Sequence, residues 1–205
     1  MRARGDPPGI EPERLIMKNS HPIMLIRHAE KPTRDPRYAD DIHGAHGRHG
    51  LSTRGERRAQ LLAAYFTASD DMLRERGLCK PQSVFGAATN AQHRSTRPVD
   101  TVKPLAAALG LEVREDFSSD PPFDKVADTL HSAAQQGPVL VCWRQDSLPE
   151  LARAIGARAV PRVWPLSRFD MIWLLARADD EWALTQVPQM LLPEDSEAPI
   201  RHEFE

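Results

Sequence analysis

Two short apolar runs constrain the possible folds of this 205-residue chain more than any other feature of its sequence. Residues 23–26 (IMLI) and residues 139–143 (VLVCW) are apolar throughout and have the length of strands rather than of helices. A continuous apolar run is typical of a strand that is covered on both faces, as in parallel sheets. The first run ends abruptly at Arg27 and His28. We therefore expect central strands that deliver polar side chains at their carboxyl ends.

Helix signals lie between the apolar runs and indicate that strands and helices alternate. Thr53 with Glu56 three residues later has the pattern of a capping box, and Thr96 is a suitable N-cap for a second helix that ends at Gly110. Further helices are predicted at 121–136 and 149–155, strands at 84–88 and 111–113, and a hairpin at 171–175 and 182–185. The pattern predicts an α/β fold, a three-layer sandwich whose mainly parallel central sheet has helices on both faces and an edge hairpin.

No internal repeat or linker divides the chain, so we expect one domain over residues 23–192. Residues 1–22 are charged, contain prolines and lack the apolar core of a signal peptide, which predicts a disordered N-terminal extension. Met17 lies just before the first strand. The alternative is that translation starts at Met17 and that the first 16 residues are not part of the protein. Residues 193–205 are expected to form a loose acidic tail.

The balance of charges excludes some classes of protein. Lys and Arg number 27 and Asp and Glu number 29, a net charge of −2, which argues against binding to nucleic acid or to a membrane surface. No apolar segment is long enough for a membrane-spanning helix, so the expected compartment is the cytoplasm. The sequence carries no signal for the oligomeric state.

Basic side chains follow three of the predicted parallel strands. Because the carboxyl ends of such strands share one edge of the sheet, these side chains should converge. They are Arg27 and His28, then His93, Arg94 and Arg97, then Arg144 with Gln145. Two guanidiniums, an imidazole and a helix N-terminus describe a pocket for a phosphoryl group. Cationic neighbours hold an imidazole neutral, and a neutral imidazole is a competent nucleophile toward phosphorus.

The histidines at positions 43, 46 and 49 also invite a metal-site interpretation. The glycines among them argue against rigid presentation of three ligands, and loops of this composition run on the surface. We therefore expect a solvated loop here, with no metal and no cofactor.

Three motifs resemble those of the histidine phosphatase superfamily, which has the phosphoglycerate-mutase-like fold. Residues 25–30 (LIRHAE) resemble its R-H-G signature, with Ala29 in place of glycine. Residues 51–55 (LSTRG) resemble L-T-x-x-G, and residues 97–101 (RPVDT) resemble R-A-x-Q-T. The resemblance covers roughly residues 23–185, in the expected order, and is strongest to a small bacterial branch.

The resemblance implies a role for each matched residue. His28 would be the nucleophile that becomes phosphohistidine, and Arg27 and Arg97 would clamp the phosphoryl oxygens. The proton donor would be a carboxylate in the acidic loop or beside the nucleophile. The candidates are Glu30, Glu115, Asp116 and Asp120, of which we favour Asp116.

One position departs from the family. The second family histidine aligns with Gln145, which offers an amide donor but no positive charge. Losing one such donor typically lowers the rate by about 10²–10³. Arg144 could supply the charge, but strand geometry would point it to the opposite face unless the loop turns it.

The sequence leaves two functions open. The first is a phosphomonoesterase, weakened at Gln145, that acts on a phosphorylated small molecule or a phosphoprotein. The second is an impaired relative that binds a phosphorylated ligand or partner without turnover. A mutase would need a polyanionic substrate and a more cationic pocket than the sequence indicates.

Overall fold

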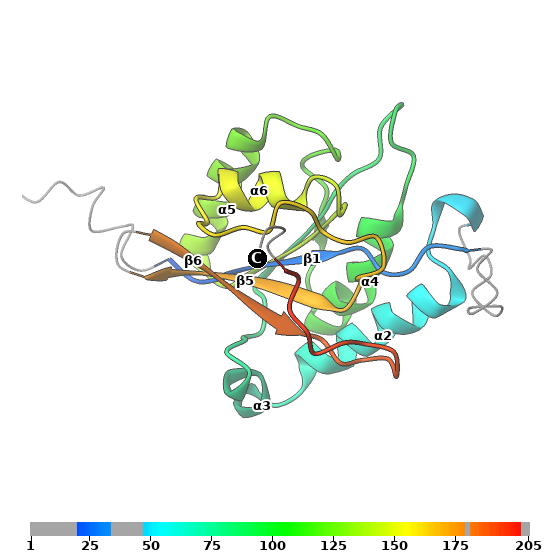
Figure 1. Ribbon diagram of the computed structural model, residues 1–205, viewed down its shortest axis with the longest axis horizontal. Helices are drawn as coiled ribbons and strands as arrows, with labels where there is room; N and C mark the ends of the chain where they lie inside the picture. The colour runs from blue at the N-terminus through cyan, green and yellow to red at the C-terminus, as the bar shows by residue number, and fades with distance from the viewer. Residues whose placement is uncertain (1–19, 34–46, 179–180, 202–205) are drawn as a thin grey trace, which may run out of the picture.

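The computed structural model describes residues 20–33, 47–178 and 181–201, and its centre is a six-stranded sheet (Figure 1). The strands are β1 (Ile23–Arg27), β2 (Ser83–Gly86), β3 (Val113–Arg114), β4 (Val139–Trp143), β5 (Met171–Ala178) and β6 (Glu181–Pro188), in the order β3-β2-β4-β1-β5-β6. The first four in this order are parallel, whereas β5 and β6 form an antiparallel hairpin at the edge. The mainly parallel sheet and the edge hairpin are confirmed.

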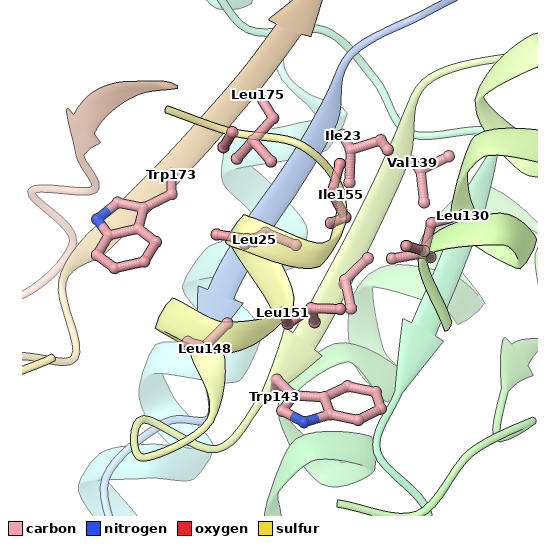
Figure 2. Packing of buried hydrophobic residues seen from close by; sticks show 14 of the residues in the cluster. Ile23, Leu25, Leu130, Val139, Trp143, Leu148, Leu151, Ile155, Trp173 and Leu175 are labelled. Carbon is pink, nitrogen blue, oxygen red and sulfur yellow. The ribbon is translucent and has the colours of Figure 1, made fainter. Parts of the chain in front are cut away.

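Helices cover both faces of the sheet (Figure 1). They are α2 (Thr53–Thr67), α3 (Asp70–Glu75), α4 (Arg97–Leu109), α5 (Phe123–Gln136) and α6 (Leu148–Ala154), with a short 3-10 turn, Gly47–His49, before α2. Side chains of β1 alternate between the layers: Ile23 and Leu25 pack with α5 and α6, whereas Met24 and Ile26 pack with α2 and α4. Figure 2 shows the first layer, where Leu148 and Leu151 lie over the sheet. The predicted three-layer α/β sandwich is confirmed.

The helix starts differ from the predicted caps. Ser52, not Thr53, is the N-cap of α2, because Ser52 is extended and its hydroxyl accepts a hydrogen bond from the backbone N–H of Gly55 at 3.1 Å. Thr96 does occupy the N-cap position of α4, but its hydroxyl donates to Asp100 at 2.6 Å instead of capping the helix. The short helix α3 was not predicted, since six residues carry too little periodicity.

The acidic tail is bound to the domain as far as residue 200, so the expected loose tail is wrong for this part. Asp195 binds the buried Arg58 at 2.6 Å. Ile200 is buried, and its backbone N–H donates to Gln186 at 2.9 Å. Residues 1–19 of the expected N-terminal extension lie outside the described residues. No helix within the described ranges is both long and apolar enough to cross a membrane.

Candidate functional site

A cavity of about 380 Å³ lies where the loops after β1, β2 and β4 meet the start of α4. His28 and Gln145 line it together with six side chains that are basic or can become so. These six are Lys31, His49, His93, Arg94, Arg97 and Arg144. The three loops expected to converge therefore do so, because parallel strands bring their carboxyl ends to one edge.

His28 is buried and held in one tautomer. Its backbone N–H donates to Trp143 at 3.0 Å, so the residue directly extends the β1–β4 pairing. Its Nδ1 lies 2.7 Å from the carbonyl oxygen of Ala29, which can only accept, so Nδ1 carries the proton. Burial lowers the pKa of His28 to about 3, and the charge of Arg27 adds to the effect. The ring is therefore neutral at pH 7 and Nε2 keeps its lone pair.

Arg27 is buried and is not among the residues that line the cavity. Its Nη1 donates to the carbonyl oxygens of Pro165, Leu166 and Arg168, at 3.2, 2.8 and 2.8 Å. Its guanidinium lies 3.7 Å from the centre of the Phe169 ring. Burial lowers the pKa of Arg27 to about 9. Its Nε and Nη2 are buried with no hydrogen-bond partner among the described groups, which leaves two donors for an incoming acceptor.

Arg97 lines the cavity as the first residue of α4. Its Nε donates to Gly50 at 2.8 Å and its Nη2 donates to Arg48 at 2.7 Å, so two carbonyl groups fix the guanidinium. Thr101, one turn later, donates to the carbonyl oxygen of Arg97 at 2.7 Å and accepts the backbone N–H of Ala29 at 2.8 Å. Thr101 thus ties α4 to the loop that carries His28, a function that the sequence pattern did not indicate.

Arg144 lines the same cavity as Gln145, so the chain does turn after β4. Its Nη1 lies 2.6 Å from Nδ1 of His93. Because a guanidinium only donates, Nδ1 of His93 accepts and its proton is on Nε2, which contacts the carboxylate of Asp120. Arg144 also forms an ion pair with Asp146 and lies 3.6 Å from Asp120. Its charge is thus present at the site but partly offset by carboxylates.

The candidate proton donors lie in different surroundings. Asp116 forms an ion pair with Arg114 and is not among the residues that line the cavity. Asp120, four residues later, touches the cavity-lining His93. Glu30 is buried and hydrogen-bonded to Arg58, which makes it an anchor for the loop rather than a free acid.

A buried ion network supports the loop that carries His28. Arg58 binds Glu30 through Nε at 3.0 Å and Nη2 at 2.7 Å, and binds Asp195 through Nη2 at 2.6 Å. Burial alone would lower the pKa of Arg58, but its hydrogen bonds to Asp195 and Glu30 raise that pKa above its usual value. Gly55 permits this packing, because a Cβ there would stand 2.3 Å from the carbonyl oxygen of Glu30.

The predicted surface loop lies only partly within the structure. His49 accepts a hydrogen bond from Arg48 at 3.1 Å, whereas His43 and His46 lie outside the described residues. The described residues contain no group of three or more side chains suited to a metal ion.

Comparison with known proteins adds structural likenesses. The sequence matches no protein-family model and no curated protein. Among solved structures, the chain is similar to a proposed phosphohistidine phosphatase SixA from Agrobacterium tumefaciens, with 17% identity, a TM-score of 0.46, and coverage of 82% of this chain and 97% of the other. It is also similar to a proposed alpha-ribazole-5'-P phosphatase from Escherichia coli, with 14% identity, a TM-score of 0.49 and the same coverage.

A third similar structure is a proposed SixA from Nakamurella multipartitia, with 17% identity, a TM-score of 0.42, and coverage of 81% of this chain and 94% of the other.

Proposed function

We propose that this chain is a phosphomonoesterase in which Nε2 of His28 takes the phosphoryl group. The observation that carries the proposal is a buried neutral imidazole, fixed with its proton on Nδ1, on the wall of a cationic cavity. An unprotonated nitrogen beside fixed positive charge is suited to attack a phosphate ester.

The reaction proceeds in two balanced steps. The lone pair of Nε2 forms a bond to phosphorus while the ester P–O bond breaks, and the leaving oxygen takes a proton from a carboxylic acid. Water then attacks the phosphohistidine, its proton returns to the carboxylate, and the N–P bond breaks to release inorganic phosphate. The protein acts by positioning these groups and by stabilising the charge that develops on the phosphoryl oxygens.

Three arginines are assigned to the phosphoryl oxygens. Arg97 is held by two carbonyl groups at the start of α4, where the free N–H groups of a helix also favour an anion. Arg27 offers two buried donors without a described partner, which a phosphoryl oxygen would satisfy. Arg144 supplies the positive charge that Gln145 lacks, while Gln145 contributes an amide donor.

Asp120 is the proton donor that the contacts favour over Asp116. Asp120 contacts Nε2 of His93, a residue on the cavity wall, whereas Asp116 is engaged by Arg114. The Asp120→Asn variant should therefore lose more activity than Asp116→Asn, most strongly with esters of poor leaving groups, which depend on protonation. The opposite ranking would restore Asp116 to this role.

A second function, binding of a phosphorylated ligand without turnover, is favoured by one observation. The cation nearest the place of the second family histidine, Arg144, is paired with Asp146 and lies near Asp120. A charge that is already offset stabilises a transition state less than a free one.

Release of phosphate from p-nitrophenyl phosphate separates the two functions. Wild type, Gln145→His and Arg144→Gln would be compared with His28→Ala as the blank. The esterase requires wild-type turnover above the blank and an acid-labile phosphoryl label on wild type that is absent from His28→Ala. Turnover by Gln145→His alone would identify a binding protein on a damaged catalytic scaffold.

A further inference from the structure

The cavity carries more positive charge than one phosphoryl group requires. Four permanently cationic side chains line it: Lys31, Arg94, Arg97 and Arg144. No Asp or Glu is among the described lining residues. Its volume of about 380 Å³ is within the range of small-molecule sites, so it has room for more than a phosphoryl group.

Three of these four charges are already accounted for. Lys31 and Arg97 line the cavity with His28 and their charges lower the pKa of His28, so we assign them to the phosphoryl group that His28 attacks. Arg144 is paired with Asp146 and lies 3.6 Å from Asp120. Of these four charges, only that of Arg94 is assigned neither to the phosphoryl group nor to a described carboxylate.

Arg94 is an exposed residue in the loop that leads into α4, three residues before Arg97. It forms no ion pair with any described carboxylate. Gln92, two residues earlier, lines the same cavity and offers amide donors to it. A guanidinium with nearby neutral donors matches a carboxylate or a phosphate, which it binds through two parallel hydrogen bonds.

We propose that the substrate is a phosphomonoester with a second oxyanion, a carboxylate or another phosphoryl group, and that Arg94 binds it while His28 attacks the ester phosphorus. This inference rests on the proposed esterase function. Arg94 is a specificity residue in this scheme. It contacts the part of the substrate away from the reacting atoms and so favours one class of ester over another.

The test compares phenyl phosphate with 4-carboxyphenyl phosphate, which differ by one carboxylate remote from the ester. Wild type should have the higher kcat/KM for the carboxylated ester, by about fivefold, the size expected for one solvent-exposed ion pair. Arg94→Ala should abolish this preference by raising KM for 4-carboxyphenyl phosphate more than KM for phenyl phosphate. Arg94→Glu should reverse the preference, and added salt should weaken it in the wild type.

The control is Arg74→Ala, which removes one positive charge from the surface of α3, away from the cavity. It should keep the wild-type preference, which excludes an effect of net charge. Equal kcat/KM for the two esters in wild type, or a preference that survives in Arg94→Glu, would overturn the inference. Absence of turnover with both esters would instead count against the proposed esterase, so the two failures are distinguishable.

Discussion

The structure predicts that Gly55→Ala lowers the stability of the protein, which is the opposite of the usual effect of this substitution in a helix. In a helix, replacing Gly by Ala ordinarily stabilises a protein by up to about 1 kcal/mol. Here the new Cβ would lie 2.3 Å from the carbonyl oxygen of Glu30 and 3.0 Å from its nitrogen, where ordinary contact begins at 3.4 Å. The two segments must therefore separate by about 1 Å, a displacement that can lower a catalytic rate by roughly 10² when it reaches the reacting group.

The loop that carries His28 cannot absorb this displacement freely. The carbonyl oxygen of Glu30 accepts from the backbone N–H of Ser52 at 3.0 Å, and its carboxylate is held by Arg58. The adjacent Ala29 is bound to Thr101, so a shift of Glu30 moves the loop that carries His28. Overpacking of this kind costs about 1–3 kcal/mol, which outweighs the gain in helix propensity.

Urea unfolding and turnover of p-nitrophenyl phosphate measure the two effects. We expect Gly55→Ala to lose about 1–2 kcal/mol of stability and roughly 10²-fold in kcat. Arg57→Ala, an exposed change in the same helix, should alter neither by much. A Gly55→Ala protein that is more stable than wild type and equally active would refute the reasoning about this contact.

Two further predictions concern buried side chains that can carry a charge. The pKa of His28 is lowered to about 3 by burial, so below pH 6.5 the unfolded chain binds a proton that the folded chain does not. The free energy of unfolding should thus fall by about 2 kcal/mol between pH 7 and pH 5 because of His28. Urea unfolding of His28→Gln should show a smaller fall. Curves of stability against pH that run parallel for the two proteins would contradict the burial of a neutral ring. Arg58→Met leaves Glu30 and Asp195 buried without this partner and should lower the free energy of unfolding by about 3–5 kcal/mol. Arg74→Met breaks an exposed pair with Asp71 and should lower it by at most about 0.5 kcal/mol in the same urea titration.

The fold could be predicted from the sequence because its signals are local. Continuous apolar runs identified β1 and β4, and two strand patterns close together in the last third of the sequence identified the hairpin of β5 and β6. The convergence of three loops followed from the parallel arrangement alone. Whether Arg144 faces the cavity could not be predicted, because strand alternation stops applying once the chain turns after Trp143.

The support of the site could not be predicted, because its partners are remote in sequence. Arg58 is 28 residues from Glu30 and 137 residues from Asp195, and no local pattern marks any of them as buried. The N-cap was misplaced for a different reason. Ser52 and Thr53 are adjacent hydroxyl residues of similar capping propensity, and only the backbone conformation distinguishes them.

The contact between Asp195 and Arg58 also has a consequence for the order of assembly during synthesis. The loop that carries His28 is among the first parts of the domain to be translated, but the Asp195 carboxylate that completes its support comes from one of the last. Until that segment leaves the ribosome, Arg58 has Glu30 as a partner but not Asp195. A chain truncated before residue 195 would therefore contain every described strand and helix, while the loop that carries His28 lacked this carboxylate.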